Sequence, residues 1–134
     1  GYRDRIEILN KENGSIYITD GPFNYIPKFT IVNSSGSSGA LIVDITEPLA
    51  YLDIAISKNY IFGLYTGKTE KQLRESSEIA NDIYVFNLEG NILLKIILDI
   101  SIRGLAVDEE SQKLYGITTD EDPGIAVFDL PNIK

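Results

Sequence analysis

The stretch that decides the fold reads IAI at residues 54–56 and, after a polar turn, IFGL at residues 61–64. The same pattern returns as LAV at residues 105–107 and LYGI at residues 114–117. Short apolar runs rich in β-branched and aromatic residues, with polar turns between them, are typical of β-strands. The two copies therefore predict a repeated pair of antiparallel strands.

The second half of the repeat occurs three times. IYVFNL at residues 83–88 matches IAVFDL at residues 125–130, and IEILN at residues 6–10 is a weaker copy. Two copies continue through a glycine turn into another strand, one at Asn13-Gly14 and one at Glu89-Gly90-Asn91. Asn-Gly is a strong hairpin signal and predicts a two-residue type I′ turn. Each repeat is therefore predicted to hold four successive antiparallel strands.

Repeats of four short strands predict an all-β fold, a partial β-propeller of about two and a half four-stranded antiparallel blades. Residues 52–98 form the complete blade, residues 104–130 supply three strands of the next, and residues 5–19 supply the last two strands of an earlier one. In the complete blade we expect strands at residues 52–57, 61–65, 83–88 and 92–98, paired in that order. We expect residues 1–134 to form a single domain that is a fragment of a β-propeller.

Two segments lie outside the repeat. Residues 29–32 and 41–45 flank a Ser/Gly-rich stretch, which predicts a hairpin with a flexible tip. Residues 66–82 form a long loop inside the complete blade. Within this loop, residues 70–80 are good helix formers and favour a short helix.

The composition excludes several classes of function. The 134 residues include 20 acidic and 12 basic side chains, for a net charge of -8, so we expect no nucleic-acid partner. Cysteine and histidine are absent, which excludes Cys/His zinc sites and Ser-His-Asp triads. The acidic clusters at residues 108–110 and 120–122 lack the spacing of an EF-hand loop, and we interpret them as solvated turns. No metal and no cofactor is predicted.

The repeats also resemble a known family. RGLAVD at residues 103–108, followed by residues 114–117 and 125–130, is similar to a propeller repeat of the NHL or TolB-like type. A longer series resembles the C-terminal part of the TolB-like six-bladed β-propeller proteins of bacteria with an outer membrane. That series reads DRIEI at 4–8, PKF at 27–29, YLDI at 51–54, YIFGLYTGKT at 60–69 and FNLEGN at 86–91.

The resemblance implies a six-bladed fold and an exported, often lipid-anchored, protein of the cell envelope. It implies no known activity. Thr66-Gly67-Lys68 stands where members of the family usually have Ser-Gly-Arg, and members are more than twice as long as this chain. The earlier blades of such a propeller are not within these residues.

Four residues are candidates for ligand binding. Tyr51, Asp53 and Arg103 lie at the starts of innermost strands, which approach the axial channel of a propeller, and an Asp and an Arg there could hold a polar ligand through charge-assisted hydrogen bonds. The alternative is a structural ion pair or a capped strand end. Lys68 lies in the TGKT stretch at 66–69, which lacks the upstream glycine of a phosphate-binding P-loop. This loop is either structural or a recognition loop for an unknown target.

These features favour a non-catalytic binding or scaffolding module of the bacterial cell envelope, with an unknown protein or polar ligand as its partner. The alternative is an enzyme acting on a carbohydrate or other polar substrate at the channel mouth, for which two carboxylates about 5–10 Å apart would be the sign. A third alternative is a segment with no activity of its own. Open blade faces also predict a homo-oligomer, unless the hairpin at residues 29–45 covers one of them.

Overall fold

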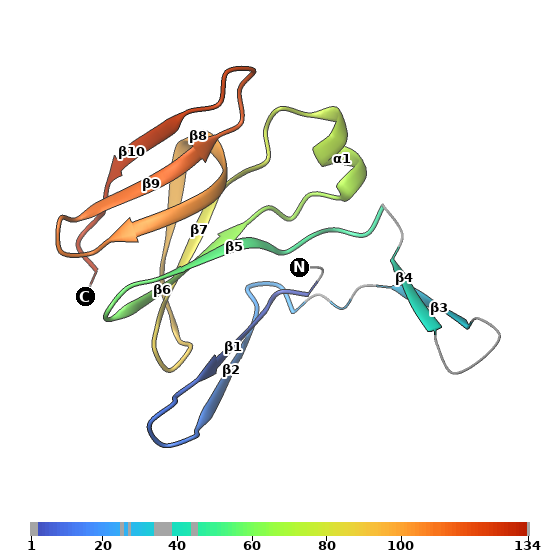
Figure 1. The fold of residues 1–134 in the computed structure, drawn as a ribbon, viewed down its shortest axis with the longest axis horizontal. Helices are drawn as coiled ribbons and strands as arrows, with labels where there is room; N and C mark the ends of the chain where they lie inside the picture. The colour runs from blue at the N-terminus through green and yellow to red at the C-terminus, as the bar shows by residue number, and fades with distance from the viewer. Residues whose placement is uncertain (1–2, 25, 27, 34–38, 44–45, 134) are drawn as a thin grey trace.

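A computed structural model describes residues 3–24, 26, 28–33, 39–43 and 46–133 of the chain. Their regular secondary structure is almost entirely β-strand, with one short helix (Figure 1). In chain order the elements are β1 (Arg5–Leu9), β2 (Ile16–Asp20), β3 (Phe29–Asn33), β4 (Gly39–Val43), β5 (Tyr51–Ile56), β6 (Tyr60–Tyr65), α1 (Glu70–Glu75), β7 (Ala80–Asn87), β8 (Ile92–Asp108), β9 (Lys113–Thr118) and β10 (Ile125–Asp129).

The repeats form one six-stranded antiparallel sheet in the order β10-β9-β8-β7-β6-β5. The predicted pairing of the complete blade, β5 with β6, β6 with β7 and β7 with β8, is confirmed. We call β5, β6, β7 and residues 92–98 of β8 the central blade. Residues 102–108 of β8, with β9 and β10, form the C-terminal blade, and β1–β2 form the N-terminal hairpin. The fold is therefore the predicted all-β partial propeller.

One strand serves both blades. Residues 92–98 and 104–108 were expected as separate strands, but the structure joins them in the 17-residue strand β8. The connecting residues 99–103 read DISIR and contain no Gly or Pro, so the backbone stays extended as it passes from one blade to the next. The outermost strand of the central blade thus becomes the innermost strand of the C-terminal blade.

The two middle strands of the central blade, β6 and β7, are buried on both faces. Phe62, Leu64, Ile83 and Val85 point to the C-terminal blade and lie in one core cluster with Leu114. The opposite face contacts the N-terminal hairpin in a second core cluster, which includes Ile6 of the hairpin with Ala50, Tyr51, Ile61, Tyr65, Tyr84 and Phe86 of the central blade and its approach. Apolar packing on both faces is what adjacent propeller blades require. The three units therefore stack as hairpin, central blade and C-terminal blade.

A glycine at the same place in both repeats allows close packing. A Cβ on Gly63 would lie 2.6 Å from the ring of Tyr51, and one on Gly116 would lie 2.5 Å from the side chain of Ile102. Both distances are shorter than any real carbon contact, so a larger residue would force its neighbour to move. The FG and YG of the repeat are thus explained by packing.

The connections divide the stack into two unlike ends. Short turns at residues 10–15, 57–59, 88–91 and 109–112 gather at one end, called here the turn end. The chain between β2 and β5, the α1 segment between β6 and β7, and the residue 119–124 connection lie at the opposite end, called here the long-connection end. This follows from the antiparallel pairing, which returns each alternate connection to the same end.

The first of the short turns differs from its prediction. Gly14 has φ +72°, but Asn13 does not have a positive φ, so a type I′ turn is wrong here. The side chain of Asn13 instead accepts hydrogen bonds from the backbone and hydroxyl of Ser15, and Gly14 N donates to Asn10 O. These contacts stabilise a six-residue connection in place of the tight turn.

The predicted helix is present but short. It begins after Thr69, where Thr69 and Gln72 form a capping box, and it ends at Glu75 rather than at residue 80. The chain is already extended at Ser76, and the last predicted helical residue, Ala80, begins β7. No helix within the described residues is long and apolar enough to cross a bilayer.

The predicted hairpin is β3–β4, paired from Phe29 with Val43 to Asn33 with Gly39. The tip was predicted at residues 33–39, of which Asn33 and Gly39 belong to the strands and residues 34–38 lie outside the described residues, as do residues 44–45 of the predicted second strand. In Figure 1 β3 and β4 stand apart from both the six-stranded sheet and the N-terminal hairpin. They therefore cover neither blade face.

Candidate functional site

A cavity of about 360 Å³ opens at the long-connection end of the stack. It is lined by Phe23, Pro48, Leu49, Tyr65, Thr66, Gly67 and Asp82. Its walls come from two sources, the connection between β2 and β5 and the end of the central blade at β6 and β7. Ligand sites are usually concave, largely apolar and furnished with a few polar groups, and this cavity fits that description. We call it the Phe23 cavity.

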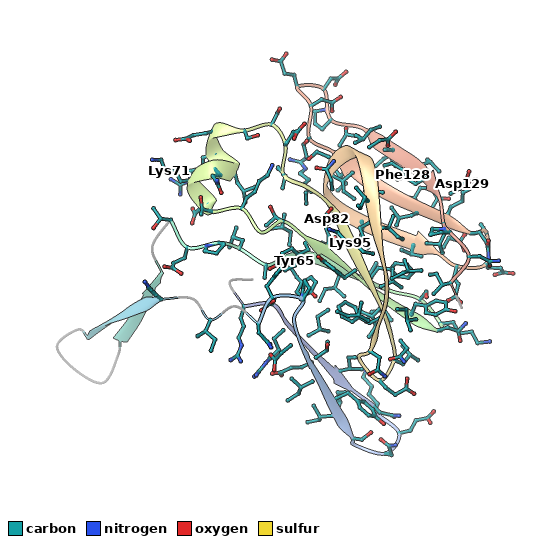
Figure 2. All side chains as sticks on the ribbon, turned by 180° about the vertical axis from the view of Figure 1, so that it is seen from behind. Tyr65, Lys71, Asp82, Lys95, Phe128 and Asp129 are labelled. Atoms are coloured by element: carbon teal, nitrogen blue, oxygen red, sulfur yellow. The ribbon has the colours of Figure 1, made fainter. Side chains whose placement is uncertain are left out.

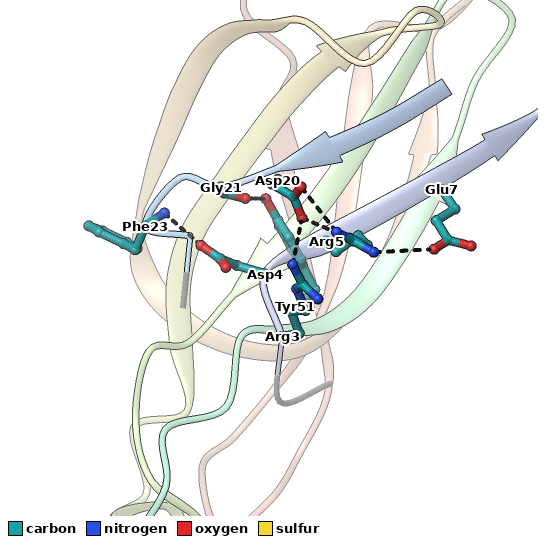
Figure 3. Close-up of polar contacts among 8 residues, drawn as sticks. All are labelled: Arg3, Asp4, Arg5, Glu7, Asp20, Gly21, Phe23 and Tyr51. Carbon is teal, nitrogen blue, oxygen red and sulfur yellow. Dashed lines mark hydrogen bonds and ion pairs between the residues drawn. The ribbon is translucent and has the colours of Figure 1, made fainter. Parts of the chain in front are cut away.

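The connection that carries Phe23 is fixed to the blade by hydrogen bonds (Figure 3). Asp4 is buried, and its carboxylate accepts from Phe23 N at 2.6 Å, while its carbonyl accepts from Gly21 N at 2.7 Å. Tyr51 donates its hydroxyl proton to Gly21 O at 2.7 Å. Three bonds around residues 21–23 therefore hold this wall of the cavity in one place.

The aromatic wall joins the rings of Phe23 and Tyr65, whose centroids lie 5.5 Å apart. Tyr65 is buried against Tyr51 and Tyr84 in edge-to-face contacts, whereas Phe23 is 67% exposed. Burial, aided by the nearby charge of Asp4, raises the pKa of Tyr65 to about 12, so its phenol is neutral at physiological pH. The buried ring of Tyr65 is thus a rigid support, and the exposed ring of Phe23 presents an apolar surface to a ligand.

The polar wall is formed by Asp82 of β7, opposite Tyr65 in the sheet register. An ion pair of 3.1 Å joins the carboxylate of Asp82 to Lys95 on β8, and Figure 2 shows the two side chains side by side, near Tyr65. Lys95 also lies over the ring of Tyr84 at 5.6 Å. The hydrogen bond to Asp82 is the main cause that raises the pKa of Lys95. A ligand would therefore meet a carboxylate whose charge is balanced by Lys95 and whose oxygen atoms can accept hydrogen bonds.

A larger hollow of about 660 Å³ lies at the turn end, lined by Ser57, Lys58, Val107, Asp108, Glu109 and Glu110. Two of its carboxylates already bond protein groups: Asp108 accepts from Ser111, and Glu109 accepts from Asn59. The Asn59–Glu109 bond joins the turns of neighbouring blades, and the Ser111–Asp108 bond lies within one turn. We therefore regard the smaller Phe23 cavity as the better candidate site.

The structure separates the four residues proposed from sequence into two groups. Tyr51 lies behind the wall of the Phe23 cavity. Lys68 follows Gly67 of the cavity lining, is partly exposed, and donates its Nζ proton to Glu78 O at 2.6 Å. Both are therefore near the cavity, Tyr51 as a support and Lys68 beside its rim.

The second group lies where the innermost strands of the two blades meet. Asp53 Oδ2 accepts from Leu105 N at 2.9 Å, and Asp53 Oδ1 accepts from Ile54 N. Arg103, two residues before Leu105, is exposed and forms no ion pair within the described part of the chain. Asp53 thus joins the blades, while Arg103 has its charge available to solvent.

Sequence reasoning missed Phe23, Tyr65 and Asp82. The predicted pairing within the complete blade did contain one signal for Tyr65 and Asp82. Antiparallel pairing of residues 61–65 with 83–88 places the end of β6 beside the start of β7. Phe23 carried no such signal, because its position depends on the buried carboxylate of Asp4.

Comparison with known protein families matches residues 2–110 to the family described as TolB-like 6-blade propeller-like. The chain belongs to this TolB-like family. Neither the curated proteins nor the solved structures provide a match. The match includes β1 through β8 of the TolB-like chain and therefore both walls of the Phe23 cavity. A family of this kind suggests a binding or scaffolding module.

Proposed function

We propose that this TolB-like chain is a non-catalytic binding module whose ligand occupies the Phe23 cavity. The observation that carries the proposal is the cavity itself, built where a long connection is bonded to the end of a rigid blade. Loops held by a rigid scaffold are the usual place for binding residues in repeat folds. The turn end, by contrast, consists of short connections braced by their own hydrogen bonds.

The lining favours binding over hydrolysis. Among the described residues that line the cavity, Asp82 is the single carboxylate, and it is paired with Lys95. Glycoside hydrolysis by the common mechanisms takes two carboxyl groups, one of them with a raised pKa. A paired carboxylate instead serves well as a fixed hydrogen-bond acceptor.

The same lining indicates the chemistry of the ligand. The free face of Phe23 suits an apolar surface, and Asp82 and Thr66 supply oxygen atoms nearby. A volume of about 360 Å³ accommodates a small molecule or one group of a larger one. We propose a polar ligand with one apolar face, bearing hydrogen-bond donors toward Asp82.

Two matched variants test this assignment. A panel of monosaccharides, amino acids and dipeptides is screened by thermal shift, and each compound that stabilises the protein is measured by calorimetry. Phe23→Ala should weaken the binding of such a compound by about tenfold or more, because the ring face is lost. Tyr17→Ala removes an aromatic side chain from β2 that is 38% exposed and outside the cavity, and it should change affinity by less than about twofold. Equal affinity of Phe23→Ala and the wild type would refute the proposal.

We propose the bacterial cell envelope as the location of this module, a proposal supported by its TolB-like family. An epitope-tagged copy of the gene in its native host, followed by cell fractionation, tests this point. The tag should be recovered with the periplasmic and membrane fractions. Recovery with a cytoplasmic marker enzyme would contradict it.

A further inference from the structure

The outer edge of the central blade has no strand beside it. Residues 92–97 of β8 pair with β7 along one edge, whereas β9 pairs with β8 only from Ile102 onward. Among the described residues, the opposite edge of residues 92–98 therefore has no partner strand, and we call it the β8 edge. The central blade already holds its four strands, so this edge does not arise from a missing strand of that blade.

The sequence of the β8 edge is unusually apolar for an unpaired edge. Residues 92–98 read ILLKIIL, with no proline and with Lys95 as the single charged residue. Natural proteins usually protect a strand edge with lysine, proline or a bulge. Lys95 is held to Asp82 of the same blade, and the register with β7 shifts only before Leu94 and after Ile97. The stretch between these two residues is therefore regular, apolar and open to pairing.

Apolar side chains are exposed along this edge. Ile97 is 72% exposed, and Ile92 is 47% exposed. Ile97 follows Lys95 by two positions and so lies on the blade face of Tyr84, which packs toward the N-terminal hairpin. The outer strand of that hairpin, β2, is present and still leaves Ile97 uncovered. The exposure of Ile97 is therefore a property of the blade rim itself.

We propose that the β8 edge binds an extended peptide segment of another protein as an additional strand of the central blade. The backbone N–H and C=O groups along a free edge supply the hydrogen bonds of such a complex, and alternate side chains supply its specificity. A β-branched or aromatic residue of the peptide is expected opposite Ile97, where it adds a cross-strand apolar contact. This surface is separate from the Phe23 cavity and its ligand.

Charge decides which peptide this edge accepts. The chain has a net charge of -8, which repels a second copy of itself and any acidic segment. A neutral or basic peptide meets no such repulsion. The partner is therefore an extended segment without net negative charge, with apolar residues at alternate positions.

Hydrogen exchange tests the added strand with the whole chain. The probes are synthetic peptides of about eight residues, enough to span residues 92–98, in which Val, Ile or Phe alternates with Thr or Lys. Binding should slow exchange about tenfold or more at those amides of residues 93–97 that point away from β7. If no peptide of the set protects these amides, the proposal is wrong.

N-methylated peptides test the pairing without altering the protein. An added strand bonds its neighbour through alternate residues, so methylation of one alternate set of peptide nitrogens removes the donors to the β8 edge. This set should weaken binding about tenfold or more, and methylation of the other set should weaken it less than about threefold. Equal losses for the two sets would refute strand addition.

Two matched variants locate the contact. Ile97→Lys should weaken binding of a basic peptide about tenfold or more, because it replaces the apolar contact with a like charge. Ile56→Lys adds the same charge at an isoleucine of β5 that is 70% exposed and outside the β8 edge, and it should change the affinity less than about twofold. Equal losses for the two variants would contradict the assigned place.

Two further results would assign another occupant. If Phe23→Ala weakens peptide binding as much as Ile97→Lys does, the peptide lies in the Phe23 cavity and the β8 edge is not its site. If the amides of residues 93–97 become protected without peptide as the protein concentration rises, and light scattering shows a mass above 14.9 kDa, a second copy covers the edge. Either result would overturn the proposal.

Discussion

Asp53 and Leu105 join the innermost strands of two successive blades: a carboxylate oxygen of Asp53 accepts a hydrogen bond from the backbone N–H of Leu105 at 2.9 Å. The two residues are 52 positions apart, and the bond lies beside Gly104, whose added Cβ would be 3.4 Å from the same oxygen. This contact fixes β5 against β8 where the blades converge. Asp53 thus has a structural role in addition to its candidacy as a ligand-binding residue.

Removing this acceptor should destabilise the blade pair. Asp53→Ala leaves Leu105 N–H without its partner, at a cost of about 1–2 kcal/mol in the free energy of unfolding. Asp53→Asn keeps an oxygen acceptor and should lose less. Asp99→Ala removes an exposed carboxylate from β8, between the two blades, and serves as the control, with little change expected. Urea unfolding of the three variants decides the matter, and equal stabilities for Asp53→Ala and Asp99→Ala would contradict this role.

The glycines of the repeat should tolerate no side chain. Gly63→Ala places a methyl group 2.6 Å from the Tyr51 ring, which its bond to Gly21 holds in place, and Gly116→Ala places one 2.5 Å from buried Ile102. Each should lower the free energy of unfolding by about 1–3 kcal/mol. Gly124→Ala is the matched control, because nothing lies within 4 Å of its added Cβ. Equal melting temperatures for the wild type and all three variants would contradict this role of the two glycines in packing.

Acid should destabilise the protein through several surface carboxylates. Hydrogen bonds from Ser57 and Asn59 lower the pKa of Glu109 below its ordinary 4.5, and the bond to Arg5 lowers that of Asp20 below its ordinary 3.8. Since a lowered pKa favours the ionised folded state, this stabilisation is complete above about pH 5 and is lost as the pH falls through the lowered values. Melting temperatures measured from pH 7 to pH 2 should fall in the acid range.

Glu109→Gln identifies one contributor to this acid response. The side chain at position 109 of the variant cannot ionise, so its melting temperature should decline less than that of the wild type between pH 5 and pH 2. Its value at pH 7 should already be lower, because the bond to Asn59 loses its charge. A wild-type melting temperature that is flat down to pH 2 would contradict the assignment of these pKa shifts.

Much of the fold could be predicted because the repeats impose it. Once IFGL and LYGI are aligned, the pairing of β5 to β8 and the buried faces of the central blade follow from alternation along each strand. The continuity of β8 was missed because two apolar runs in sequence look the same whether or not a bend separates them. Local patterns do not encode a change of blade without a turn.

The candidate site was much harder to predict. Tyr51 and Lys68 were singled out for a channel and a loop, and both lie near the cavity, Tyr51 through a bond to Gly21 and Lys68 through the neighbouring Gly67. The ring of Phe23 is placed by Asp4, a residue 19 positions earlier that reads as an ordinary surface carboxylate. Such tertiary hydrogen bonds leave no periodic trace in the sequence.

A titration followed by ¹H–¹⁵N NMR tests directly whether the long-connection end of this TolB-like propeller binds a ligand in the Phe23 cavity. The titrant is the tightest-binding compound of the monosaccharide, amino-acid and dipeptide panel. We predict the largest chemical-shift changes at the amides of Phe23, Leu49 and Gly67, with little change at the turn end. Shifts confined to residues 57–58 and 107–110, around the larger hollow of the turn end, would contradict it.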